Sequence, residues 1–179
     1  MVELANKDYY KHYLKLEPSQ IAHMSSIVGI PWSCKLIYGI MSDKLPFMGY
    51  KRKSYIILMG FLQFSSLFSI YFFEIQDTKY LVICNFLSRL SGAFLDVIVD
   101  ALMVVYSKQD QDDGSEELQS LSWGALGVGG MFSSLAGAYL TEYHHPKITY
   151  LIYSLYGLVV MFLGIKLSKD DESEINEDK

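Results

Sequence analysis

The stretch between residues 29 and 55 decides the fold of this chain, and it reads Gly29-Ile-Pro-Trp-Ser-Cys-Lys-Leu-Ile-Tyr-Gly-Ile-Met-Ser-Asp-Lys-Leu-Pro-Phe-Met-Gly-Tyr-Lys-Arg-Lys-Ser-Tyr55. Its first half is apolar except for Lys35, and its second half is a polar turn that contains Asp43. Three consecutive cations at residues 51–53 end the polar turn, and another apolar run follows. A helix that leaves a membrane, a short charged loop and a helix that re-enters produce this pattern.

The distribution of charge along the 179 residues indicates an integral membrane protein. Hydrophobic residues make up 51% of the chain, and several segments of about 20 residues, the length needed to cross a bilayer core, carry almost no charge. Most charged residues lie in the gaps between these segments. The net charge of −5 comes mainly from one loop and the tail, so it gives no support to nucleic-acid binding. We therefore predict an all-α membrane protein.

Five membrane-spanning helices are predicted, with no soluble domain. Residues 1–18 form a polar and aromatic arm that is disordered or lies at the membrane interface. Residues 19–167 form the helical bundle, and residues 168–179 form an acidic tail that we expect to be disordered. The predicted spans are residues 21–41, 55–73, 80–106, 118–140 and 148–167.

Lysine and arginine in the connecting segments predict the orientation of the bundle. Placing the loop of residues 44–53 in the cytoplasm puts eight of these cations on that side and five on the other. The positive-inside rule therefore favours this orientation, with the arm outside and the tail inside.

Four ionisable residues lie within the predicted spans, namely Lys35, Arg89, Asp96 and Asp100. The last three are spaced by seven and four residues, which places them on one face of a helix. Such residues are costly in a membrane and usually pair or line a polar path. One interpretation is structural, with Asp96 paired to Lys35 or Arg89. The other, which we favour, is a substrate or proton pathway.

Small residues cluster in the fourth predicted span. A Gly-x-Gly-Gly run resembles a dinucleotide-binding loop only superficially, because no strand precedes it. Small residues that let helices approach closely explain the cluster better. The residues assigned to helix packing are Gly124, Gly127, Gly130 and Ser134.

Neither enzymatic nor metal chemistry is indicated. His144 and His145 lie side by side in a loop, and no cysteine or third histidine follows at ligand spacing. Cys34 and Cys84 both lie in apolar runs, where cysteine behaves as a small packing residue. We predict no enzyme activity, no metal and no cofactor.

Four motifs follow one another along the chain. The loop between two spans carries Gly39-x-x-x-Asp43 followed by Gly49, Lys51 and Arg52. The other three motifs are the segment from Pro31 to Gly39, the segment from Asp96 to Leu102, and the segment from Leu118 to Gly124. Together they resemble the folate–biopterin transporter family of the major facilitator superfamily, and the resemblance covers nearly the whole chain apart from its acidic tail.

This resemblance implies a fold and a function. The five spans would match helices 2–6 of a major facilitator half, and helix 1 and the second half would be absent. The implied function is membrane transport of folate, biopterin or a related solute, with proton coupling left open. The motif loop would form a cytoplasmic gate made by Gly39, Asp43, Gly49, Lys51 and Arg52.

The same residues are also compatible with a second function. The chain would then be a non-transporting truncated subunit, with a partner chain that supplies the missing helices, or an inactive remnant of such a transporter. In either case the chain would lie in the lipid bilayer.

Overall fold

The computed structural model describes residues 2–45, 52–73, 77–107 and 114–166, and these residues form helices with no strand. The all-α membrane fold predicted from the sequence is thereby confirmed. The predicted acidic tail, residues 168–179, lies outside the described residues. The elements in chain order are α1 (Val2–Asp8), the π-helix η1 (Tyr9–Tyr13), α2 (Pro18–Ser33), α3 (Lys35–Lys44), α4 (Lys53–Phe72), α5 (Thr78–Ser107), α6 (Gly114–Tyr143) and α7 (Lys147–Lys166).

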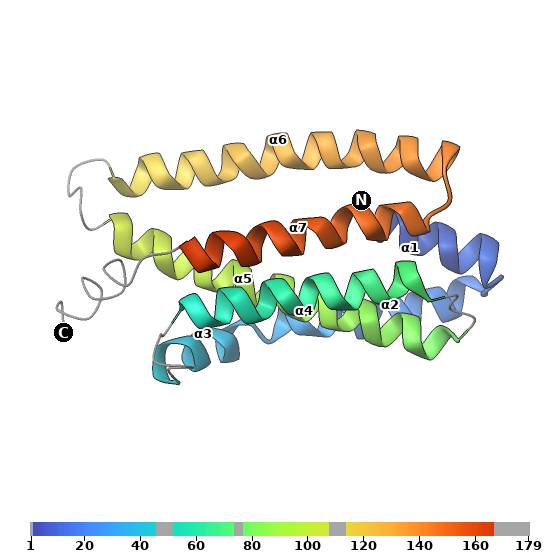
Figure 1. Ribbon diagram of the computed structural model, residues 1–179, viewed down its shortest axis with the longest axis horizontal. Coiled ribbons are helices and arrows are strands. Elements are labelled where there is room, and N and C mark those ends of the chain that lie inside the picture. The colour runs from blue at the N-terminus through green and yellow to red at the C-terminus, as the bar shows by residue number, and fades with distance from the viewer. Residues whose placement is uncertain (1, 46–51, 74–76, 108–113, 167–179) are drawn as a thin grey trace.

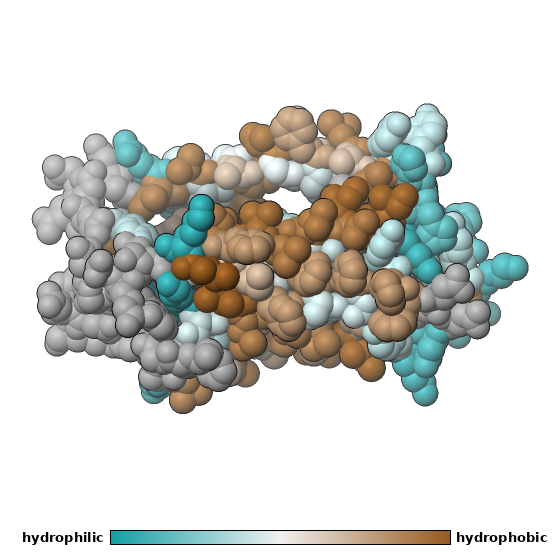
Figure 2. All heavy atoms as spheres, viewed as in Figure 1, coloured by the Kyte–Doolittle hydropathy of each residue, from teal (hydrophilic) through white to brown (hydrophobic). Residues whose placement is uncertain are grey.

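The long helices run along one common axis (Figure 1). Helix α4 packs against α5 and α7, and α2 and α3 pack against α5. Helix α6 runs along one side of the molecule, while α1 lies at one end and α3 at the other (Figure 1). Hydrophobic residues cover the middle of the face seen in Figure 2, and hydrophilic residues gather toward its ends, as expected for helices that cross a bilayer.

Among the described helices, α4, α5 and α7 are long and apolar enough to cross a membrane. They carry the predicted spans at residues 55–73, 80–106 and 148–167. The predicted span at residues 118–140 lies inside α6, whose glycines and serines make it less hydrophobic. The predicted span at residues 21–41 falls on two helices, α2 and α3. Five crossings therefore remain a prediction.

The break between α2 and α3 has a cause in the sequence. Pro31 has no backbone N–H, and its ring crowds the carbonyl of the preceding turn, so a proline inside a helix kinks or ends it. Three residues later, Cys34 has φ −95° and ψ 11°, and its N–H donates to the carbonyl of Pro31 at 3.2 Å instead of continuing the α-helical pattern. The chain then starts again as α3 at Lys35.

Helices α4 and α7 touch backbone to backbone at two glycines. A Cβ atom placed on Gly60 would lie 2.8 Å from the nitrogen of Met161, and one on Gly157 would lie 2.7 Å from the nitrogen of Phe64. Both distances are shorter than real Cβ contacts. Only glycine therefore permits this backbone-to-backbone approach of α4 and α7.

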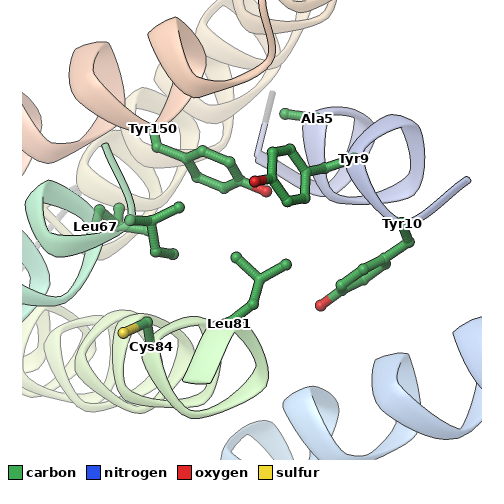
Figure 3. Packing of buried hydrophobic residues seen from close by; sticks show 8 residues of the cluster. Ala5, Tyr9, Tyr10, Leu67, Leu81, Cys84 and Tyr150 are labelled. Atoms are coloured by element: carbon green, nitrogen blue, oxygen red, sulfur yellow. The ribbon is translucent and has the colours of Figure 1, made fainter. Parts of the chain in front are cut away.

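The N-terminal arm packs into the bundle rather than remaining disordered, which corrects one of the two expectations for residues 1–18. Tyr9 and Tyr10 point toward Leu81 and Tyr150 (Figure 3). The two tyrosines are 5% and 2% exposed. Burial raises the pKa of Tyr10 to about 12, because the charged phenolate would be poorly solvated there.

A buried polar network joins this arm to two long helices. The side-chain amide of Asn6 donates to Oδ1 of Asn85 on α5 at 2.9 Å, and the hydroxyl of Tyr150 on α7 donates to Oδ1 of Asn6 at 2.5 Å. Asn85 in turn donates to the carbonyl of Leu81 at 2.9 Å. Because buried polar groups are costly without partners, this network fixes the position of α1.

The glycine contact predicts a position-specific loss of stability. Gly60→Ala should lower the free energy of unfolding by about 1–3 kcal/mol, because the added methyl group forces α4 and α7 apart. Gly129→Ala on α6 is the matched control, since nothing lies within 4 Å of a Cβ at that position. Unfolding of each variant in detergent micelles, followed by circular dichroism, measures the difference. Equal stability of the two variants would contradict the close contact.

Candidate functional site

The polar face of α5 carries the predicted charges along one side of the helix. Arg89, Asp96 and Asp100 lie on this face, spaced over three turns. Arg89 lies toward the arm, whereas Asp96 and Asp100 lie toward the break between α2 and α3. The structure therefore separates the four predicted charges into two groups.

Lys35 and Asp96 form an ion pair between α3 and α5. The ammonium of Lys35 also lies 3.9 Å from the centre of the Trp32 ring, which is a cation–π contact. Trp32 and Lys35 are three residues apart on either side of the helix break, so the break brings both side chains to the same point. Of the two pairings that the sequence allowed for Asp96, the structure has the one with Lys35.

A cavity of about 650 Å³ opens between α2–α3, α5 and α6 beside this ion pair. Asp100 lines it, and no hydrogen bond or ion pair to its carboxylate occurs within the described part of the chain. Polar and aromatic side chains from α6 form the opposite wall. The residues lining the cavity are Trp32, Lys35, Asp96, Asp100, Met103, Val104, Ser107, Ser115, Leu118, Gln119, Ser122, Trp123 and Leu126.

Arg89 pairs with a residue of the arm. Its Nη2 lies 3.6 Å from Oε2 of Glu3, and the ammonium of Lys7 lies 3.2 Å from Oε1 of the same carboxylate. The hydrogen bond and charge of Lys7, with a smaller effect of Arg89, lower the pKa of Glu3. Two smaller cavities, of about 250 and 190 Å³, border this cluster, and Trp32 lines both of them as well as the larger cavity. Trp32 thus lies between the two charge groups.

Two contacts join the helix ends on either side of the motif loop, where the sequence predicts a gate. Nη2 of Arg52 lies 3.3 Å from Oδ1 of Asp43, so the ends of α3 and α4 are joined by an ion pair. The hydroxyl of Tyr55 donates to the carbonyl of Leu45 at 2.8 Å and ties the same ends together. A Cβ at Gly39 would meet Val97 at an ordinary 3.5 Å. Gly49 and Lys51 lie outside the described residues.

The four residues of α6 that were assigned to helix packing make no close helix contact within the described chain. Nothing lies within 4 Å of a Cβ placed on Gly124, Gly127 or Gly130, and Ser134 is exposed. The predicted close packing is therefore absent among the described helices, and it stays a prediction for contacts with other protein.

Two residues that contact the charged side chains of α5 or α3 were not identified from the sequence, namely Glu3 and Trp32. Glu3 lies in the arm, where no intramembrane charge was sought, and only its distance from Arg89 in the folded chain shows the pairing. Trp32 belongs to the motif beginning at Pro31, and its closeness in the sequence to Lys35 was a signal that the two side chains could meet. Among the described residues, no group of three His, Cys, Asp or Glu side chains could hold a metal ion.

Comparison with known proteins identifies the lineage of these helices. The BT1 family matches the chain over residues 1–179. The chain belongs to the BT1 family. The motifs that carried the resemblance to folate–biopterin transporters are thus part of a match over the whole sequence.

Individual relatives bear matching names. A folate-biopterin transporter of Synechocystis sp. is 31% identical over 97% of this chain and 35% of its own length. A probable folate-biopterin transporter 4 of Arabidopsis thaliana is 31% identical over 81% of this chain and 30% of its own length. Folate transporter 1 of Plasmodium falciparum is 24% identical over 92% of this chain and 32% of its own length.

Two further results concern the coverage of the relatives and the solved structures. The chain spans about a third of the length of the curated BT1 relatives it matches. No solved structure matches the chain at a significant level.

The Lys35–Asp96 ion pair predicts coupled effects on stability. Lys35→Met and Asp96→Asn should each destabilise the protein, since each leaves a partly buried charge without its partner. The double variant should lose less than the sum of the two, by about 1–3 kcal/mol. A double-mutant cycle on unfolding in detergent micelles measures this coupling energy.

The exposed pair of Asp43 and Arg52 provides a matched cycle. Because the Asp43 side chain is 57% exposed, solvent screens this pair, and its coupling energy should stay below about 1 kcal/mol. Additive effects at Lys35 and Asp96 would show that their contact contributes nothing to the fold.

Proposed function

We propose that this chain forms part of a membrane path for folate, pterin or a related solute. The observation that carries the proposal is the cavity of about 650 Å³ between α2–α3, α5 and α6, which is lined by charged and aromatic side chains. The family and the names of the relatives supply the class of solute. Folates combine a flat heteroaromatic ring with carboxylates, so a path for them needs aromatic surface and cations.

The two charge groups on α5 fit the two ends of such a solute. Arg89 presents a planar guanidinium, which suits a carboxylate. It lies seven residues from Asp96, or about 10 Å along the helix axis. A ring in the large cavity beside Asp96 and Asp100 and a carboxylate near Arg89 would then both lie along one face of α5.

The ion pairs support a working cycle for this path. Glu3 pairs with Arg89 and Asp96 pairs with Lys35, and in this cycle these pairs would neutralise the cations before a solute binds. A solute carboxylate that reaches Arg89 would replace Glu3, so the arm would release as the solute binds. The pair of Asp43 and Arg52 would hold the cytoplasmic ends of α3 and α4 together in one access state. Proton coupling would fall to Glu3, the carboxylate freed from Arg89 in this exchange.

Uptake of radiolabelled folic acid into proteoliposomes that contain the chain tests the proposal. The wild-type chain should accumulate folic acid above protein-free vesicles. Arg89→Ala should reduce this uptake at least about tenfold, because a charged hydrogen-bonding partner is lost at the carboxylate site.

Lys79→Ala is the control, because it removes a cation at the start of α5 that lines none of the three cavities. Its uptake should match that of the wild type. Uptake that Arg89→Ala leaves unchanged would exclude this path, and absence of uptake by the wild type would exclude transport by this chain on its own.

A further inference from the structure

Two side chains in the large cavity make no direct contact of the kind that would occupy them. The indole of Trp123 on α6 is 69% exposed and makes no ring or cation contact within the described residues. The carboxylate of Asp100 on α5 lies in the field of Lys35 but has no hydrogen bond or ion pair among them. By contrast, Lys35 lies over the Trp32 ring and pairs with the Asp96 carboxylate.

Trp123 and Asp100 line one cavity from two different helices. An exposed indole offers a flat apolar surface, and stacking on such a surface is a general way to bind heteroaromatic rings. A carboxylate has two oxygens side by side, and it pairs best with two parallel N–H donors, as it does with arginine. The cavity therefore offers a stacking surface and a two-acceptor group to the same ligand.

A pterin ring presents the complementary edge. Its 2-amino group and its N3–H lie next to each other and point in the same direction, so they can donate two parallel hydrogen bonds to one carboxylate. We propose that Asp100 binds this edge while the ring stacks on Trp123. This inference rests on the proposed function and assigns the ring-recognising carboxylate to Asp100.

The site makes a prediction about ligand preference. Pterin and lumazine differ in one group, since lumazine carries a 2-oxo group where pterin carries the 2-amino group. The wild-type chain, with the acceptor pair of Asp100, should bind pterin more tightly than lumazine. Asp100→Asn places one acceptor and one donor at the edge, which matches the N3–H and the 2-oxo group of lumazine. The preference should therefore shift toward lumazine by about tenfold to a hundredfold.

Equilibrium dialysis of both compounds against the purified chain in detergent micelles measures this ratio. Asp96→Asn is the matched control, because it is the same change one helical turn away. It is expected to alter the affinity for both rings by the same factor, since Lys35 occupies that carboxylate. Trp123→Leu should weaken binding of both rings about tenfold and leave their ratio unchanged, because stacking does not distinguish them.

The outcomes separate this site from the proposed function. A shift toward lumazine in Asp100→Asn alone supports the site. Pterin binding by the wild type with the same preference in Asp100→Asn overturns the assignment of Asp100 and leaves the proposed path intact. Absence of saturable binding of either ring to the wild-type chain overturns both. Circular dichroism of each variant checks that the helices have formed.

Discussion

The cost of an unpaired charge in hydrocarbon governs how this bundle is arranged. Each cation on the polar side of the bundle lies against a carboxylate from a distant part of the chain, Lys35 against Asp96 and Arg89 against Glu3. These two pairs join α5 to α3 and to α1, so neutralisation also positions the helices. Asp100 differs from Arg89 and Asp96 on α5, because its exposed carboxylate has no ion pair among the described residues. It lines the large cavity instead.

Much of the fold was predictable because its signals are local. Long apolar runs and the charged gaps between them indicate the helices of residues 53–72, 78–107 and 147–166. The break at Cys34 was less predictable, because a proline within an apolar run is compatible with either a kink or an interruption. The docking of the arm could not be predicted, since it depends on Asn6 meeting Asn85 and Tyr150, which are far away in the sequence.

The candidate site was likewise predictable only in part. The spacing of Arg89, Asp96 and Asp100 placed them on one face from the sequence alone. Their partners were harder to assign, because a side chain of Lys35 or Glu3 reaches α5 only through the packing of other helices. The role of Trp123 was hidden for another reason. Its motif carried the resemblance to the family, but only the folded chain shows that it lines the large cavity.

The close contact of Gly60 with Gly157 has a mechanical consequence. At these two positions no side chain lies between the helices to absorb a displacement, so a shift of α4 would push directly on the backbone of α7. Helix α6 has no such contact at Gly124, Gly127, Gly129 or Gly130, because nothing lies within 4 Å of a Cβ placed there. The large cavity is thus bounded by a helix that these four glycines do not clamp against a neighbour among the described residues.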